Sequence, residues 1–327
     1  MRAPLPGIVT CLHGVWGSDE PSAGTANISS ARLEELLSLL SNTTRIVPLA
    51  DLLERIERGR STYGLSAVTF DDAYLSVRDL ALPLLERHRA PACVFVVSGA
   101  AREGARYWWD RIEDLHPRTR PERWRQLEEA AGLPQAYRDG QPGDLGPLRP
   151  LRQWLLAEHR GRAPGALDEG LSRLEEELGW RTAQRSMTME ELRGLGRHEL
   201  ISLGVQTETH AALALLPDTD VHRVIDSSYR ALQDQQLRVL PVLAAPFGLV
   251  DSRTARLAAD CGMRSTLLVS ARSLWGGVTL SAVPRMMMSE PRRGWRLLLN
   301  LTGAADAGRT LLGRRSPLAP PLPSATS

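Results

Sequence analysis

Lysine is absent from this sequence of 327 residues: all 40 of its Lys and Arg residues are arginine. The chain therefore cannot form a Schiff base through a lysine amine or use the lysine of a phosphate-binding loop. Against 38 acidic residues the arginines leave a formal net charge of +2. So small an excess gives no electrostatic reason to expect a nucleic-acid partner.

Cysteine is also scarce. The three cysteines, Cys11, Cys93 and Cys261, fall in or beside predicted core elements and lack the spacing of a metal site. Because three thiols cannot all pair within one chain, we expect them to be buried and reduced.

Long apolar runs are missing as well, so we expect no integral membrane segment. Residues 1–7 are interrupted by proline and do not have the pattern of a secretory signal. Length and composition indicate a globular protein with a sizeable core, and we expect a cytoplasmic enzyme. Nothing in the sequence indicates the oligomeric state.

The sequence is organised around Leu65–Phe70, an apolar run of strand length that ends in the adjacent carboxylates Asp71 and Asp72. A strand that is apolar throughout is buried on both faces, so its C-terminal end is where chemistry can emerge. Two adjacent acids repel each other, and a divalent cation neutralises one of them well. We expect one acid to be a metal ligand and the other a base.

Further apolar runs alternate with segments of helical spacing. A strand, a helix and a strand of this length favour parallel pairing and an α/β fold. Strands are expected at 7–12, 65–70, 91–97, 200–205, 239–245, 263–270 and 278–288. Helices are expected at 31–40, 50–57, 75–88, 219–236 and 251–261, with Ser29-Ser30 before the first and a Thr188/Glu191 capping box before a short helix.

Thr69-Phe70-Asp71-Asp72-Ala73-Tyr74 resembles the first motif of the polysaccharide deacetylases, the NodB-homology group. The resemblance implies an irregular (β/α) barrel of about seven parallel strands and metal-assisted hydrolysis of an acetamido group on a sugar. By the same resemblance Asp71 is the base, Asp72 is a ligand of a divalent metal, expected to be zinc, and Tyr74 is a candidate substrate contact.

The strand that ends at Val205 is followed by Gln206-Thr207-Glu208-Thr209-His210. The second family motif reads His-Thr-x-x-His here and supplies two metal-binding imidazoles. His210 matches the second imidazole, but Gln206 stands in place of the first, and an amide oxygen is a weaker zinc ligand. If the backbone stays extended, Gln206, Glu208 and His210 lie on one side, which makes Glu208 a hypothetical replacement ligand.

Ala245-Pro246-Phe247-Gly248 resembles the third family motif, so Pro246 and Phe247 are candidate substrate contacts. Ala244 stands where one branch of the family has arginine. The late Leu-x-His of the family, whose histidine is the general acid, is missing. His13, at the end of the first strand, is the replacement that the sequence offers, although a histidine at such a place is more often structural.

The segment from about 102 to 186 has no strand pattern and is predicted to be a helical insertion at the C-terminal edge of the barrel. Tyr107-Trp108-Trp109-Asp110 opens it. The family often has an aromatic pair and an acid at this point, so Trp108, Trp109 and Asp110 are candidate substrate contacts. Aromatic pairs pack cores as readily as they stack on sugars, and a passive helical cap is the alternative.

We expect one domain over residues 1–302, including the insertion, followed by a disordered tail at 303–327. The predicted function is metal-dependent removal of the N-acetyl group from an amino sugar in a glycan, glycolipid or nucleotide-sugar precursor. Two alternatives stay open: a catalytically silent sugar-binding homologue with a degraded metal site, and a metal-independent hydrolase of another C–N bond.

Overall fold

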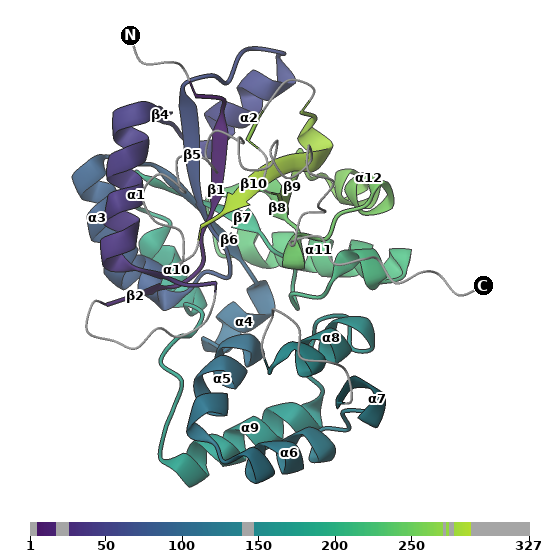
Figure 1. Cartoon of the computed structure of the whole chain (residues 1–327). Helices are drawn as coiled ribbons and strands as arrows, with labels where there is room; N and C mark the ends of the chain where they lie inside the picture. Colours follow the sequence, from purple (N-terminus) through teal and green to yellow (C-terminus); the bar gives the residue numbers. More distant parts are fainter. Residues whose placement is uncertain (1–4, 18–25, 139–146, 271–272, 275–277, 289–327) are drawn as a thin grey trace, which may run out of the picture.

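The computed structural model describes residues 5–17, 26–138, 147–270, 273–274 and 278–288. Its centre is a closed barrel of seven parallel strands surrounded by helices (Figure 1). The predicted (β/α) barrel is therefore confirmed. The predicted tail at 303–327 lies outside the described residues, and the domain boundary at 302 stays a prediction.

The barrel strands are mostly apolar and mostly buried, as expected for parallel strands covered by helices. Pairing of the first strand, β1, with β5 closes the barrel. A short strand, β4 (Arg45–Ile46), also pairs with β5 but lies outside the barrel. In the order in which hydrogen bonds join them, the ring strands are β1 (Ile8–Cys11), β10 (Val283–Met287), β9 (Ser265–Val269), β8 (Val239–Ala244), β7 (Ile201–Val205), β6 (Ala92–Val96) and β5 (Leu65–Phe70).

Two of the helices that cover the barrel begin at caps that the sequence predicts. The Ser29 hydroxyl accepts a hydrogen bond from the Arg32 N–H (3.3 Å), and Thr188 and Glu191 form a capping box. A short parallel pair, β2 (Val15–Trp16) and β3 (Ile28–Ser29), precedes the first helix. The helices are α1 (Ser30–Thr43), α2 (Leu49–Glu57), a π-helical turn (Val77–Ala81) continued by α3 (Leu82–His88), α10 (Met189–Leu195), α11 (Asp218–Gln233) and α12 (Ser252–Asp260).

The C-terminal end of β6 leads through α4 (Ser98–Glu103) into a group of helices that lie together beside the barrel (Figure 1). These helices pack around a core of their own, which includes Trp124, Leu151 and Leu171. The described part of the predicted insertion is therefore helical. Its helices are α5 (Trp108–Leu115), α6 (Pro121–Ala130), α7 (Gln135–Arg138), α8 (Arg149–Ala157) and α9 (Gly165–Leu178).

No helix in the described part of the chain has both the length and the apolar character that crossing a bilayer requires.

Candidate active site

Asp71 emerges from the end of β5 and is held by an arginine from the last strand. Arg285 donates from Nη1 to Oδ1 of Asp71 (2.6 Å) and from Nη2 to Oδ2 (2.7 Å), and both side chains are buried. Burial alone would raise the pKa of Asp71, but the charge and hydrogen bonds of Arg285 outweigh it and hold this pKa below its usual value. Asp71 is therefore a fixed carboxylate at neutral pH.

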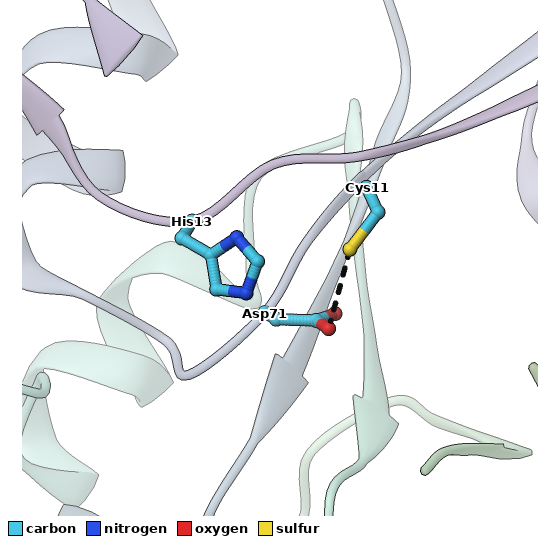
Figure 2. A group of neighbouring side chains, drawn as sticks. All are labelled: Cys11, His13 and Asp71. Carbon is cyan, nitrogen blue, oxygen red and sulfur yellow. Dashed lines mark hydrogen bonds between the residues drawn. The ribbon is translucent and has the colours of Figure 1, made fainter. Parts of the chain in front are cut away.

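Cys11 and His13 lie beside Asp71 (Figure 2). One ligand-type atom from each of the three side chains lies within 4.8 Å of the other two, and the Cys11 thiol lies 3.5 Å from Oδ2 of Asp71. Burial raises the pKa of Cys11 well above that of a free thiol. Burial lowers the pKa of His13, although Asp71 works in the opposite direction. At neutral pH the cluster thus holds a thiol, a neutral imidazole and a carboxylate.

Asp72 faces His210, at the end of the loop after β7. Oδ1 of Asp72 lies 3.3 Å from Nε2 of His210. Within the described structure this Oδ1 and the other imidazole nitrogen, Nδ1, have no hydrogen-bond partner. Burial lowers the pKa of His210 to about 3, so its imidazole is neutral. Burial and the neighbouring Asp71 raise the pKa of Asp72 well above the usual value.

Gln206 joins these two residues. Its Oε1 accepts a hydrogen bond from the backbone N–H of Asp72 (2.7 Å), and its Nε2 lies 3.4 Å from Nε2 of His210. The backbone N–H fixes the orientation of the amide, because turning the amide over would place two donors against each other. The edge of Gln206 that faces His210 is therefore an N–H donor.

Glu208 does not join this group. Its carboxylate accepts hydrogen bonds from Arg102 (3.0 Å) and from the Ser227 hydroxyl (3.0 Å). The expected extended backbone is interrupted at Thr207, whose φ is +66°, and the alternation that would align Glu208 with Gln206 is lost. Glu208 ties the loop to α4 and α11 instead of completing a metal site.

Aromatic rings form a wall beside His210. The ring centroid of Trp109 lies 4.7 Å from that of His210, and the ring centroid of Phe247 lies 4.8 Å from it. Tyr107 stacks on Trp109 at 4.5 Å with an interplanar angle of 9° and donates from its hydroxyl to the Asp72 carbonyl (2.8 Å). Phe247 is 38% exposed. The wall therefore joins the acid pair to the surface.

The buried acid Asp110 holds Trp109 of the aromatic wall in place through Tyr74. The Tyr74 hydroxyl donates to Oδ2 of Asp110 (2.6 Å) and accepts from Nε1 of Trp109 (2.9 Å). Burial raises the pKa of Asp110 to about 7, although the hydrogen bonds from Tyr74 and Asn27 lower it. Tyr74 and Asp110 are both buried, so here they position Trp109.

Trp108 and Pro246 have supporting places in the same region. The indole of Trp108 donates to the Gly161 carbonyl (3.0 Å), within the helical insertion. Pro246 is buried and begins the turn that holds Phe247 at a φ of +58°. A Cβ on Gly161 would lie 2.2 Å from the Phe247 ring, so the glycine leaves the space that Phe247 occupies.

Known proteins share this architecture. No family model matches the chain, and no curated protein matches it in sequence. IcaB from Ammonifex degensii superposes with a TM-score of 0.57 at 18% identity, over 92% of this chain and 98% of that one. The Streptococcus pyogenes deacetylase PplD in complex with acetate gives 0.56 at 12%, over 92% and 99%. A de-N-acetylase from Aggregatibacter actinomycetemcomitans gives 0.56 at 13%, over 90% and 99%.

This chain has the fold of the polysaccharide deacetylases. The predicted resemblance is confirmed at the level of the fold. The acid pair, which carried the resemblance in the sequence, lies at the carboxyl end of β5, where active sites of parallel barrels assemble.

The divalent metal that the resemblance implies can be tested against the donor atoms. Two ligand atoms about 2.1 Å from a tetrahedral zinc ion lie about 3.4 Å apart, which suits Asp72 and His210. A catalytic zinc site needs a third protein ligand. Gln206 presents an N–H group to His210, and Glu208 is turned away. The described residues therefore do not complete a three-ligand zinc site around Asp72 and His210.

The neighbouring Cys-His-Asp cluster is poorly suited to a cation. Both carboxylate oxygens of Asp71 accept hydrogen bonds from Arg285, and burial raises the pKa of the Cys11 thiol, which a metal would have to deprotonate. The guanidinium charge also opposes a second cation at this distance.

The structure thus brings together most of the predicted residues and adds others. Arg285, Tyr107 and Cys11 were not singled out as site residues. Arg285 could have been found from the sequence, because it interrupts the otherwise apolar run Val283–Met287. A buried cation needs a buried anion, so an arginine in such a strand indicates an acidic partner. The predicted residues found around the acid pair are Asp71, Asp72, His13, Gln206, His210, Tyr74, Trp109, Asp110 and Phe247.

Proposed function

We propose that this protein hydrolyses the N-acetyl group of an amino sugar bound at the mouth of the barrel. The observation that carries the proposal is Asp71, an ionised carboxylate fixed by Arg285 beside a neutral His13. The fold supports it, because the solved structures with this architecture include a deacetylase in complex with acetate and a de-N-acetylase.

The aromatic wall is the proposed binding surface for the sugar. Trp109 and the exposed Phe247 offer apolar ring faces of the kind that stack on pyranose rings. Trp109 cannot rotate freely, because Tyr74 accepts its indole hydrogen bond and Tyr107 stacks on it. A sugar on this wall places its acetamido group toward His210 and the acid pair.

Asp71 and His13 then supply the proton transfers. Asp71 accepts a proton from a water molecule as the water oxygen attacks the acetamido carbonyl carbon. A proton passes to the leaving nitrogen through His13, whose ring lies in the same cluster. The C–O bond forms and the C–N bond breaks, and the products are acetate and the free amino sugar.

Zinc is the ion that the resemblance implies, and it would polarise the acetamido carbonyl if it were bound. Asp72 and His210 are the residues that face each other at ligand spacing. Because the third ligand is missing, the proton transfers above are assigned to Asp71 and His13 alone.

A second candidate function is sugar binding without turnover. Gln206 favours it, because the amide replaces a ligand of the family motif while the aromatic wall stays intact. The third possibility from the sequence, hydrolysis of another C–N bond, uses the same acids without a metal.

A measurement of acetate release distinguishes hydrolysis from sugar binding without turnover. Purified protein should release acetate from N-acetylated amino-sugar oligosaccharides, alone or with added zinc, cobalt or manganese, and Asp71→Asn should not. Binding of such sugars without acetate release in any condition would establish the second candidate. The precursor-type substrate and the cytoplasmic location stay predictions, which a substrate panel and cell fractionation can test.

A further inference from the structure

We propose that Gln206 takes the place of the catalytic cation: its amide links Asp72 to His210, and the site works without a resident divalent metal. The inference rests on the proposed function only in that it treats this cluster as the active site. Gln206 is 1% exposed and Asp72 is 2% exposed, so the hydrogen bond between them is made away from bulk water.

The first step of the argument is the fixed orientation of the amide. Asp72 adopts a φ of +65°, an uncommon conformation for a non-glycine residue, and its N–H points at Oε1 of Gln206. A buried N–H without an acceptor loses its hydrogen bond to water and gains none in return. The amide oxygen is therefore committed to Asp72, and the amide nitrogen must face His210.

The second step concerns His210. The Nε2 of its imidazole, which would bind a metal, lies 3.4 Å from the amide nitrogen of Gln206. A cation at this position would meet the positive end of the amide dipole instead of a lone pair. The hydrogen-bond donor and the cation compete for the same imidazole nitrogen.

The third step is that the amide nitrogen of Gln206 is the one atom that prevents a third zinc ligand at this position. Asp72 and His210 already lie 3.3 Å apart, at the spacing of two tetrahedral zinc ligands. In a Gln206→Glu variant one carboxylate oxygen can still accept the Asp72 N–H while the second replaces the amide nitrogen. The glutamate side chain has the same size and shape as that of glutamine. The variant therefore carries three oxygen and nitrogen ligands, from the new carboxylate, Asp72 and His210.

Zinc titration in the absence of substrate tests the proposal. The wild type should bind zinc weakly, and Gln206→Glu and Gln206→His should each bind one equivalent at least about 10-fold more tightly. Gln153→His is a matched control: Gln153 is exposed on α8 with Arg149 and Ala157 one turn away, and the added histidine should not raise zinc affinity. Circular dichroism and the change in melting temperature with zinc report whether each variant is folded.

The proposal is overturned if the wild type binds one equivalent of zinc as tightly as Gln206→Glu, or if neither folded variant gains affinity over the control. These outcomes do not depend on turnover. A failure of the proposed function would show instead as absent acetate release, with the zinc affinities unchanged.

Discussion

Replacing Arg285 should lower the free energy of unfolding by more than the loss of an exposed ion pair does. In Arg285→Met, Asp71 keeps its buried position and loses both hydrogen bonds, because the two side chains are 0% and 4% exposed in the wild type. Breaking a buried pair from one side costs about 3–5 kcal/mol, since it leaves an uncompensated charge. The free energy of unfolding at pH 7 should fall by that amount, out of a total of about 5–15 kcal/mol.

The loss should depend on pH in a defined direction. In the wild type the pKa of Asp71 is lowered, so its contribution is present above the unfolded-state pKa and is lost only when the pH falls through the folded-state value. Without Arg285, burial raises the pKa of Asp71, and the carboxyl takes up a proton as the pH falls. The difference between wild type and variant should therefore shrink between pH 7 and about pH 4.

Urea denaturation at both pH values measures this difference. Arg264→Met is the surface control, because its pair with Glu57 is 37% and 48% exposed and should be worth at most about 1 kcal/mol. The double variant Asp71→Asn, Arg285→Met removes both charges and should be more stable at pH 7 than Arg285→Met alone. A loss in Arg285→Met that equals the control and stays constant with pH would refute the buried-pair argument.

Three further predictions follow from the same contacts. In Arg285→Met the acid limb of the pH–rate profile for acetate release should move to higher pH, because the pKa of Asp71 rises; an unmoved limb would show that Asp71 is not the base. Trp109→Ala should weaken binding of N-acetylated oligosaccharides roughly tenfold, or about 1.4 kcal/mol, in calorimetry; Trp180→Ala, 40% exposed on the insertion, should not. Gly161→Ala should cost about 1–3 kcal/mol of stability and weaken sugar binding, because its φ is +82° and its Cβ would meet Phe247. Gly179→Ala, at a φ of +57° with nothing within 4 Å, should weaken stability but not binding.

The parallel strands could be predicted from the sequence because they are mostly apolar runs, whereas the closed barrel was implied by the resemblance to the deacetylase motifs. Leu65–Phe70 and Ala92–Val96 show the apolar pattern plainly, and both are barrel strands. The caps at Ser29 and Thr188 were predictable for a similar reason, since they depend on residues three positions apart.

The partners of the site residues were harder to predict. Arg285 meets Asp71 across 214 positions of sequence, and only the closed ring of strands brings them together. Glu208 was placed by assuming an extended backbone, but Thr207 and His210 both have positive φ values, which non-glycine residues seldom adopt. Local pattern could not reveal that conformation, because the contacts that hold it come from β6 and α11.

The rate of acetate release from an N-acetylated amino-sugar oligosaccharide, measured before and after removal of divalent metals with a chelator, tests the central claim most directly. We expect the same rate in both samples and none from Asp71→Asn. A wild-type rate of zero, or a rate that chelation abolishes and zinc restores, would contradict the account.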